Sequence, residues 1–213
     1  MKRAVDLVAA ALGLLLIWPV FAVVAVAIAF DSSGPVFFRQ ERVGAGGRLF
    51  RIWKFRTMVT NAERSGGQLT VGDDPRITRV GRWLRRTKLD ELPQLLNVLC
   101  GEMCLVGPRP EVPRYVSFYG AAERRVLSLT PGITDPASLA YFDEQKQLAA
   151  EAEPERVYVE RIMPAKIRLN LAYAERASMW SDLHVIGATL WRTMKSTGSG
   201  TSAGVLVDSA HHS

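Results

Sequence analysis

The sequence predicts an α+β protein that is mostly helical, with an N-terminal membrane element, a short β-hairpin and amphipathic interfacial helices. Three observations predict this class. Residues 7–30 carry no charged side chain, two strand-like runs flank a Gly-rich loop, and from residue 143 onward the pattern is helical. The length of 213 residues corresponds to about one domain. We expect a membrane-embedded segment at 1–30, a cytosolic domain at 31–195 and a disordered tail at 196–213.

The apolar N-terminal segment is long enough to enter or cross a bilayer, for which about 20 residues suffice. Three interpretations compete. Ala27-Ile28-Ala29 resembles the cleavage site of a signal peptide, but the apolar run is much longer than usual. In a single-pass helix, Lys2 and Arg3 favour a cytoplasmic amino end, whereas the arginines behind residue 30 favour a cytoplasmic body. A re-entrant helix satisfies both flanks.

Trp18-Pro19, in the middle of this segment, offers a place where such a helix can turn back. Proline removes a backbone hydrogen bond and kinks a helix. We therefore expect a re-entrant helix broken at Pro19, with a kinked spanning helix as the alternative.

The residues that follow predict a β-hairpin. Two runs rich in β-branched and aromatic residues, Val36–Arg42 and Arg48–Phe55, are separated by Gly44–Gly47. The second strand ends on a pair of cations, Lys54 and Arg56. Further along we expect a polar loop, a basic helix, another helix and a tight loop, at residues 61–72, 79–88, 113–129 and 131–136.

The last helix has an apolar face at helical spacing, made of Trp180, Leu183, Ile186, Gly187, Leu190, Trp191 and Met194. Such a face packs in the core of many soluble proteins. Here the two tryptophans and the membrane segment favour a helix that lies at the membrane interface.

Charge is concentrated in the middle of the chain. The formal net charge is +6, and residues 36–125 hold 17 basic and 9 acidic side chains. Such a block attracts nucleic acid, anionic lipid headgroups or a polyphosphate ligand. The only cysteines, Cys100 and Cys104, do not make a disulfide framework, which favours a reducing compartment. With three histidines, two of them in the polar tail, we do not expect zinc.

The stretch from Lys88 to Asn97 combines chemistry with a helix start. Asp90 and Glu91 stand directly before an apolar run, so we place Asp90 at or near the N-cap of a helix that reaches about Leu99, with Gly101 as its C′ residue. The helix dipole and the neighbouring cations, Arg85, Arg86 and Lys88, favour a permanently ionised Asp90 and a bound phosphate. Asp90 is then a nucleophile on phosphorus, a magnesium ligand, both, or only a cap.

Arg109 lies between Pro108 and Pro110. The two rings reduce its backbone freedom, so its guanidinium is presented with little ordering left to do. Such a group suits a bidentate contact to phosphate, although a Pro-Arg-Pro sequence is also an ordinary rigid turn.

Six motifs in a fixed order resemble those of a known family. They lie at residues 34–40, 54–58, 73–78, 90–97, 107–111 and 131–134. The chain is similar, over about residues 2–195, to the bacterial sugar transferases, the monotopic phosphoglycosyl transferases that start glycan or exopolysaccharide assembly on polyprenyl phosphate.

The resemblance implies a transferase that works in two steps. Asp90 attacks a nucleoside-diphosphate sugar, typically a UDP-sugar, and UMP leaves while the phosphosugar stays on the enzyme. Polyprenyl (undecaprenyl) phosphate then takes the phosphosugar. Mg²⁺ would be bound by Asp90 and Glu91, with Glu91 as either a metal-orienting residue or an acid/base partner. The implied location is the bacterial inner (cytoplasmic) membrane, with the catalytic domain on the cytosolic face.

The resemblance also assigns binding roles. Phosphate binding falls first to Arg85 and to Arg109 with its flanking Pro108 and Pro110. Further candidates for phosphate binding are Lys54, Arg56 and Arg76, and Asp73 is a further candidate site residue. Each of the four could instead form a structural ion pair. Membrane lipid is an expected partner, nucleic acid is not, and a homodimer is left open.

The sequence departs from the family pattern at two places. Trp18 stands where many relatives have a small polar residue before the proline, and residues 135–138 replace a Gly followed by an aromatic residue and Gln. The second departure bears on sugar choice, so the sugar is not predicted. The additional membrane domain of larger relatives is not recognised here, and we expect a minimal catalytic unit.

Three alternatives stay open: a membrane-anchored, non-catalytic binder of anionic lipid or nucleic acid, a transferase that moves only the sugar and releases UDP, and a processed secreted protein. The nucleotide released separates the first two from the family reaction. The amino terminus of the mature protein tests the third.

Overall fold

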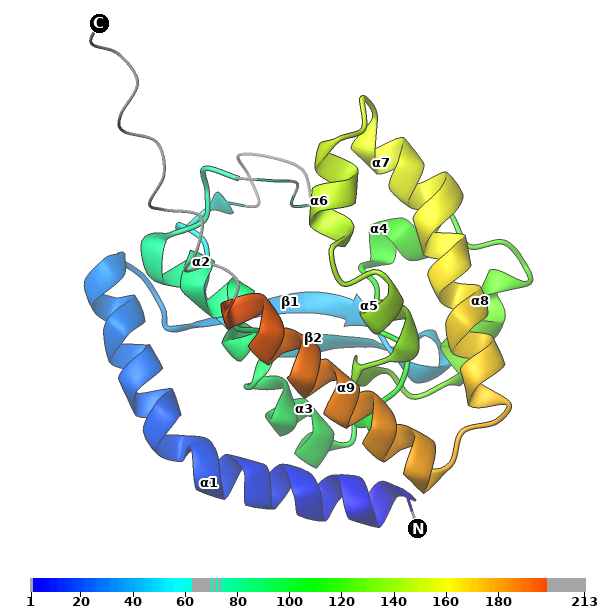
Figure 1. The fold of residues 1–213 in the computed structure, drawn as a ribbon, viewed down its shortest axis with the longest axis horizontal. Coiled ribbons are helices and arrows are strands. Elements are labelled where there is room, and N and C mark those ends of the chain that lie inside the picture. Colours follow the sequence, from blue (N-terminus) through cyan, green and yellow to red (C-terminus); the bar gives the residue numbers. More distant parts are fainter. Residues whose placement is uncertain (1, 63–69, 71, 73, 199–213) are drawn as a thin grey trace, which may run out of the picture.

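The computed structural model describes residues 2–62, 70, 72 and 74–198, and its ribbon confirms a mostly helical α+β fold (Figure 1). The elements in order are α1 Lys2–Asp31, β1 Phe37–Val43, β2 Leu49–Phe55, α2 Arg79–Arg86, α3 Gln94–Cys100, β3 Cys104–Val106, α4 Pro113–Val116, β4 Gly132–Thr134, α5 Pro136–Ala140, α6 Glu144–Ala149, α7 Pro154–Val157, α8 Met163–Ala174 and α9 Met179–Gly198. The predicted tail beyond 198, most of the predicted loop at 61–72 and Asp73 lie outside the described residues.

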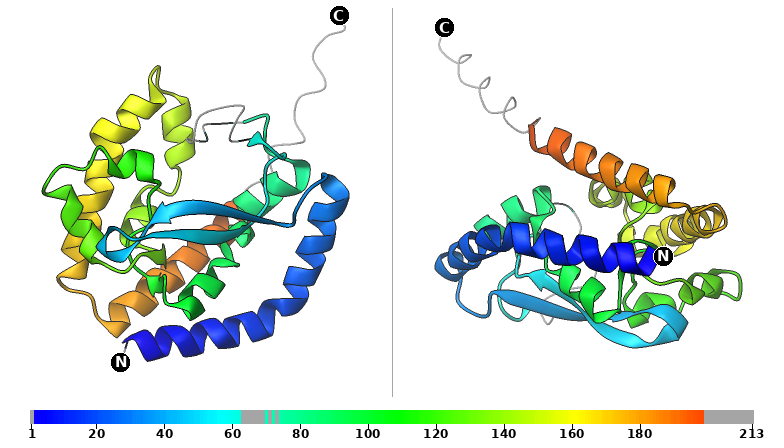
Figure 2. Two further views of the ribbon diagram at one scale, coloured as in Figure 1. Left: turned by 180° about the vertical axis from the view of Figure 1, so that it is seen from behind. Right: turned by 90° about the horizontal axis from the view of Figure 1, so that it is seen from below.

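The N-terminal helix α1 runs through Pro19 as one helix, and its ribbon bends near the middle (Figures 1 and 2). Within the described part of the chain it is the one helix long and apolar enough to cross a membrane, judged by length and composition, and only 11% of its apolar window is buried in the protein. Trp18 is 64% exposed. The bend agrees with a proline inside a helix. A re-entrant course through the membrane stays a prediction.

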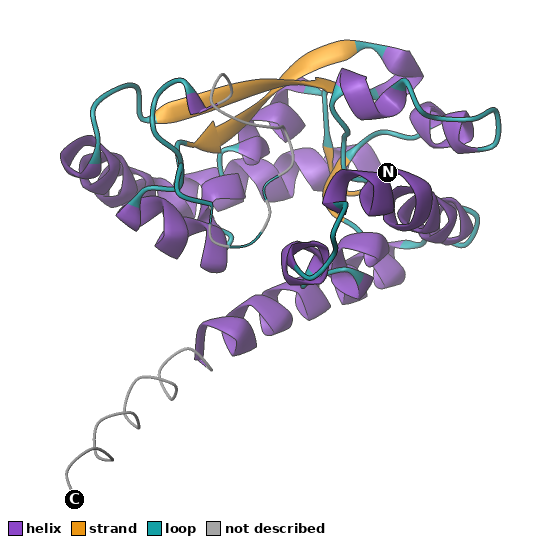
Figure 3. Ribbon diagram, turned by 90° about the horizontal axis from the view of Figure 1, so that it is seen from above, coloured by secondary structure: helices purple, strands orange, loops and turns teal. Residues whose placement is uncertain are grey.

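The predicted hairpin is confirmed. β1 and β2 pair antiparallel from Phe37↔Phe55 to Val43↔Leu49, and Gly46 and Gly47 adopt the left-handed conformation in the connecting loop. Glycine takes this conformation without a steric penalty. The hairpin lies along one side of the molecule, with most helices on the other (Figure 3).

A second sheet of two short parallel strands, β3 and β4, was not predicted, because we expected a tight loop at residues 131–136. Strands of three residues are too short to show an alternating pattern. The two backbone segments lie in close contact at Gly107 and Gly132. A Cβ on Gly132 would lie 2.1 Å from the Gly107 nitrogen. The prediction of one helix over 113–129 was also wrong. The segment forms α4 and a 3₁₀ helix, Glu123–Ser128, and the interruption includes Gly120, whose helix propensity is low.

Two apolar clusters hold α1 against the hairpin. Its first half packs Ala10 with Ile52, Val98 and Met103, and its second half packs Val24 and Ile28 with Phe55 and Leu84. A third cluster joins α4 to α6 and α8, with Tyr115, Leu148, Tyr158, Met163 and Ile167 among its members. The strand β2 is therefore covered by α1, α2 and α3.

From residue 143 to the end of the described chain the structure is helical, as predicted. The two prolines in this stretch lie at helix starts. Pro154 begins α7, and Pro164 lies in the first turn of α8 after a π-helical turn, Tyr158–Ile162. On α9 the predicted apolar face points outward, since Trp180, Trp191 and Met194 are 82%, 70% and 70% exposed. Contact of this face with a membrane stays a prediction.

Gly81 provides a test of how closely α2 approaches the hairpin. A Cβ at this buried position would lie 2.1 Å from the Thr57 carbonyl oxygen, whereas a Cβ on Gly187 of α9 would meet nothing within 4 Å. We expect Gly81→Ala to destabilise the fold by about 2–3 kcal/mol through overpacking. Gly187→Ala should be neutral or stabilise by up to about 1 kcal/mol, because alanine favours a helix. Thermal unfolding in detergent measures both, and equal melting temperatures would contradict the close approach.

Candidate functional site

The two acidic residues lie on a 3₁₀ turn, Leu89–Glu91, between α2 and α3. Lys88 precedes this turn in the left-handed conformation with φ 56°, which is uncommon for a residue other than glycine. Pro93, not Asp90, occupies the N-cap of α3, so the predicted capping role of Asp90 is wrong. The end of that helix is as predicted, since Gly101 follows Cys100 with φ 87°.

Asn97 fixes α3 to the free edge of β2. Its Oδ1 accepts from the Trp53 backbone nitrogen at 2.9 Å, and its Nδ2 donates to the Arg51 carbonyl at 2.9 Å and to Glu102 Oε2 at 2.7 Å. The side chain is 0% exposed. An amide that both donates to and accepts from a strand replaces the neighbouring strand, so it satisfies an edge that would otherwise be unpaired.

Asp90 is 6% exposed, and its Oδ1 is buried with no hydrogen-bond partner among the described residues. Burial raises the pKa of Asp90, and the neighbouring Glu91 raises it further, while Lys54, Lys88 and Arg85 lower it. Burial and Glu91 thus outweigh the lowering that we expected from the neighbouring cations, and a permanently ionised Asp90 stays a prediction. Arg86, which we also expected beside Asp90, is exposed on α2.

Glu91 binds two cations. Lys54 of β2 donates from Nζ to Oε1 at 2.9 Å, and Arg109 donates to both carboxylate oxygens, from Nη1 to Oε2 at 3.1 Å and from Nη2 to Oε1. Burial raises the pKa of Glu91, but Arg109 and Lys54 together hold it well below its usual range. Burial also lowers the pKa of Lys54 to about 8, against the opposing effect of Glu91. Glu91 raises the pKa of Arg109.

The segment that carries Arg109 is held on both sides, as its prolines predicted. The Pro108 carbonyl accepts from the Gly132 nitrogen at 3.0 Å, and the Pro110 carbonyl accepts from Arg42 Nη1 at 3.0 Å. Arg109 binds Glu91 in a bidentate pair, so in this structure a carboxylate takes the geometry that we predicted for a phosphate.

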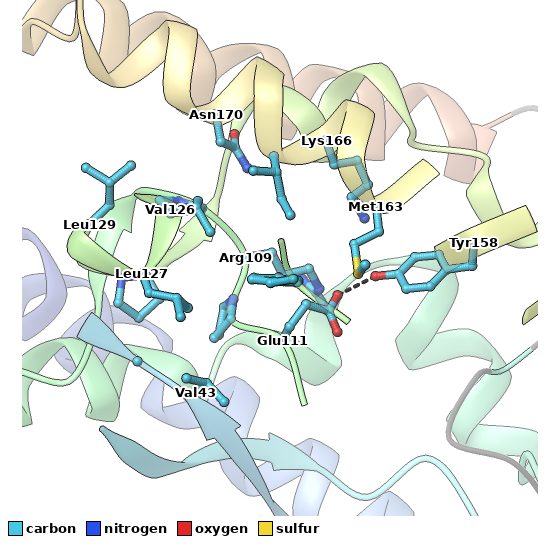
Figure 4. A pocket seen from close by; sticks show the side chains of 16 residues that line it. Val43, Arg109, Glu111, Val126, Leu127, Leu129, Tyr158, Met163, Lys166 and Asn170 are labelled. Carbon is cyan, nitrogen blue, oxygen red and sulfur yellow. Dashed lines mark hydrogen bonds between the residues drawn. The ribbon is translucent and has the colours of Figure 1, made fainter. Parts of the chain in front are cut away.

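A cavity of about 40 Å³ lies beside Arg109, and Glu111, Tyr158, Lys166 and Asn170 are among the side chains around it (Figure 4). Tyr158 donates its hydroxyl to Glu111. Arg42 and Tyr158 support the Arg109 segment, and neither was predicted from the sequence. No local signal marks them, because each is an ordinary strand or helix residue in the sequence.

The charge of Arg85, on α2, lowers the pKa of Asp90, as expected for a cation near this carboxylate. Its Nη2 donates to Thr70 Oγ1 at 3.1 Å, and its Nη1 is buried without a partner in the described part of the chain. Asp90 and Arg85 therefore each present an unsatisfied polar atom in the same region. Buried polar atoms are rarely left unpaired, so these two atoms are candidates for contact with a ligand, an ion or water.

Two other predicted phosphate binders have structural contacts. Arg56, 5% exposed, donates to the Ser32 carbonyl at 2.7 Å and to the Ser33 carbonyl, where α1 ends. Arg76 binds the Asp74 carboxylate, with Nη2 to Oδ2 at 2.5 Å, and also donates to the Ala62 carbonyl. These contacts tie the chain together around the hairpin.

The described residues hold no group of three or more histidine, cysteine or acidic side chains that could bind a metal ion by itself. The unpaired Oδ1 of Asp90 is the oxygen that fits a cation. Both oxygens of Glu91 are taken by Lys54 and Arg109. A magnesium ion would therefore need most of its ligands from a bound diphosphate and water, as is usual for Mg²⁺.

Comparison with known proteins gives the class. The bacterial sugar transferase family matches residues 1–196, and the chain belongs to this family. It is 40% identical over 198 residues to the undecaprenyl-phosphate glucose phosphotransferase of Komagataeibacter xylinus, an alignment that covers 90% of this chain and 35% of that protein.

Two further relatives are closer to this chain in length. One is a putative undecaprenyl-phosphate N-acetylgalactosaminyl 1-phosphate transferase of Bacillus subtilis, 42% identical over 63% of this chain and 81% of its own. The other is a UDP-glucose:undecaprenyl-phosphate glucose-1-phosphate transferase of Caulobacter vibrioides, 39% identical over 89% of this chain and 68% of its own. The chain spans less than half the length of several other relatives.

Asn97→Asp tests the contact between α3 and β2. The substitution keeps the acceptor for Trp53 but places a carboxylate oxygen against the Arg51 carbonyl and Glu102, where an amide donated before. We expect a loss of about 3 kcal/mol of unfolding free energy, from an unsatisfied acceptor and like charges. The expected fall in melting temperature is roughly 6–12 °C.

The double variant N97D/E102Q is the matched control, because a Gln side chain can donate to the new carboxylate. It should recover part of the loss, about 1 kcal/mol, whereas Glu102→Gln alone should not stabilise the protein. Additive effects of the two substitutions would contradict the Asn97–Glu102 contact.

Proposed function

We propose that this protein transfers a sugar-1-phosphate from a UDP-sugar to undecaprenyl phosphate and releases UMP. The observation that carries the proposal is the buried Asp90, whose Oδ1 has no partner among the described residues and which lies among Lys54, Lys88 and Arg85. Family membership supports the reaction class, and the relatives named above act, by name, on undecaprenyl phosphate. The sugar is left open.

The first step uses Asp90 as the nucleophile. Its free carboxylate oxygen attacks the β-phosphorus of the UDP-sugar, the bond from that phosphorus to the bridging oxygen breaks, and UMP leaves with the electron pair. An aspartyl phosphosugar remains. The cations around Asp90 stabilise the negative charge on the phosphoryl oxygens and weaken the repulsion between carboxylate and diphosphate.

The second step regenerates the carboxylate. An oxygen of undecaprenyl phosphate attacks the same phosphorus, and the bond to Asp90 breaks, which gives undecaprenyl-diphosphate-sugar. Burial raises the pKa of Asp90, which means that the ionised carboxylate is poorly solvated, and a poorly solvated carboxylate is more reactive as a nucleophile.

Glu91 has a positioning role in this proposal. Its bidentate pair with Arg109 and its bond to Lys54 hold two cations beside Asp90 while Glu91 itself stays ionised. A bound Mg²⁺ would take most of its ligands from the diphosphate and water beside Asp90, and it would supply positive charge that stabilises the leaving UMP.

Asp90→Asn is the direct test of the nucleophile. We expect UMP release from a UDP-sugar panel to fall by at least about a thousandfold, because the amide cannot form the phosphosugar intermediate. The variant should melt no lower than the parent, since it replaces a carboxylate whose pKa is raised by burial with a neutral group. Intact mass of the parent, incubated with donor but no acceptor, should show the added phosphosugar.

Asp143→Asn, at a half-exposed carboxylate on the surface, is the matched control and should keep full activity. UDP in place of UMP would show transfer of the sugar alone. UMP release that persists in Asp90→Asn would remove Asp90 as nucleophile, and neither nucleotide from any donor would favour a non-catalytic binder.

The pKa of Lys54 predicts a pH dependence. Because burial lowers this pKa to about 8, Lys54 loses its charge as the pH rises through 8, and the site loses one of the cations beside Asp90. The single-turnover rate of UMP release should therefore fall above pH about 8. It should also fall at low pH, where Asp90 becomes protonated, which gives a bell-shaped profile.

Lys54→Arg should move the alkaline limb upward, because arginine stays charged. An unchanged limb in this variant would exclude Lys54 as its cause. The effect of rising pH on stability has the opposite sign to its effect on activity. The pKa of Lys54 in the folded protein lies below its ordinary value of 10.5, so the folding cost of burying charged Lys54 is present below pH 8 and fades between about 8 and 10.5.

A further inference from the structure

The side chain of Gln94, the first residue of α3, carries a buried donor that has no partner in the described part of the chain. Gln94 is 2% exposed, and no hydrogen bond from its Nε2 is present among the described residues. An amide donor that loses water without gaining a partner destabilises the fold, and such donors are rare in folded proteins. The side chain of Gln94 therefore needs an explanation.

The backbone places Gln94 on the same face as Glu91. The two residues between them have right-handed helical φ and ψ. The Leu92 and Leu95 nitrogens each donate to the carbonyl oxygen three residues earlier. Residues three apart on such a 3₁₀ path lie one above the other. Gln94 thus follows Glu91 by one turn on a continuous helical path.

This shared face is turned toward β2. Glu91, one turn before Gln94, binds Lys54 of β2. Asn97, one turn after Gln94, binds the backbone of the same strand. Side chains three and four positions apart on a helix are neighbours, and Gln94 is also four residues after Asp90. The amide of Gln94 is therefore next to the ion pairs of Glu91 and to the proposed nucleophile.

The two amides on α3 differ in how they are paired. The oxygen and nitrogen of Asn97 all bind protein groups, so this amide holds α3 to β2. The nitrogen of Gln94 contributes no such bond within the described residues. Because it is already buried, a contact with a ligand would cost it no further loss of water. The donor of Gln94 is available for a bound group.

The unpaired donors beside Asp90 match the phosphoryl group of the proposed intermediate. The phosphorus of an aspartyl phosphosugar is bonded to the Asp90 oxygen and the sugar oxygen, and its two non-bridging oxygens share the negative charge. Arg85 Nη1 and Gln94 Nε2 are two buried donors without partners in the described chain. One donor for each non-bridging oxygen would satisfy both side chains.

We propose that Gln94 is a catalytic residue whose Nε2 donates to a non-bridging oxygen of the phosphoryl group that is transferred to Asp90. The inference rests on the proposed function and adds a residue to its site. A fixed, desolvated donor placed where negative charge develops acts as an oxyanion hole, and removing one such donor slows a reaction by about a hundredfold or more.

Melting temperatures of the free protein test whether the Gln94 amide serves the fold. Gln94→Met keeps the length of the side chain and removes an unpaired polar group, so it should raise the melting temperature by at least about 2 °C. Asn97→Leu is the matched comparison and should lower it, because two backbone groups of β2 lose their partner. An unchanged or lower melting temperature in Gln94→Met would show a structural amide and overturn the proposal.

Ligand binding and single-turnover rates test the contact with phosphate. The binding probe is α,β-methylene-UDP with Mg²⁺, which has the diphosphate oxygens but no cleavable bridge and no sugar. Gln94→Met should bind it about tenfold more weakly, as expected for a lost hydrogen bond to a charged group. At saturating UDP-sugar it should release UMP about a hundredfold more slowly. Gln147→Met, the same substitution at an exposed position of α6, should match the parent in both.

The two measurements separate this inference from the proposed reaction. UMP release by the parent with an equal rate and equal probe affinity in Gln94→Met would reject the role of Gln94 and retain the reaction. No UMP release by the parent, together with weaker probe binding by Gln94→Met, would retain the phosphate contact and reject the reaction.

Discussion

The geometry of the site depends on the ion pairs that the buried carboxylate of Glu91 forms. It joins β2 through Lys54, the turn between α2 and α3, and the Pro-flanked segment after β3 through Arg109. An isolated buried charge is costly, and its cost is offset only when good partners are in place. The three segments must therefore be brought together before Glu91 is satisfied. Asp90, whose Oδ1 has no hydrogen-bond partner among the described residues, is positioned by the adjacent Glu91.

The two adjacent carboxylates have similar chemistry, and their different surroundings give them different pKa values. Glu91 has two cations at hydrogen-bond distance and a pKa held well below its usual range, whereas Asp90 has a buried oxygen without a partner in the described chain and a raised pKa. Environments that push two neighbouring pKa values apart give acidic groups different roles. Here the paired residue organises cations, and the unpaired residue is left available for a ligand.

The sequence predicted those parts of the fold that have a local signal. Glycines mark the hairpin loop, Gly101 marks the end of α3, and prolines fix the Arg109 segment. The N-cap assignment of Asp90 failed because the left-handed turn at Lys88 inserts a 3₁₀ turn, which no residue pattern announces. The strands β3 and β4 were not predicted, because their pairing depends on the contact between two glycines that are distant in the sequence. For the site, the roles of the predicted residues stay predictions, and the structural alternative left open for Arg56 and Arg76 agrees with the contacts that these two residues make.

The helix α2 connects α1 with the site. Asp31, at the end of α1, accepts from the Val80 nitrogen at 2.9 Å, and Gly81 lets α2 lie against Thr57 at the end of the hairpin. Both ends of α1 are also fixed, since Arg3 donates to the Val98 carbonyl at 2.7 Å. A helix tied at each end and bent in the middle cannot shift relative to α2 and α3 without breaking these contacts. The depth of α1 in a bilayer would therefore set the depth of Asp90.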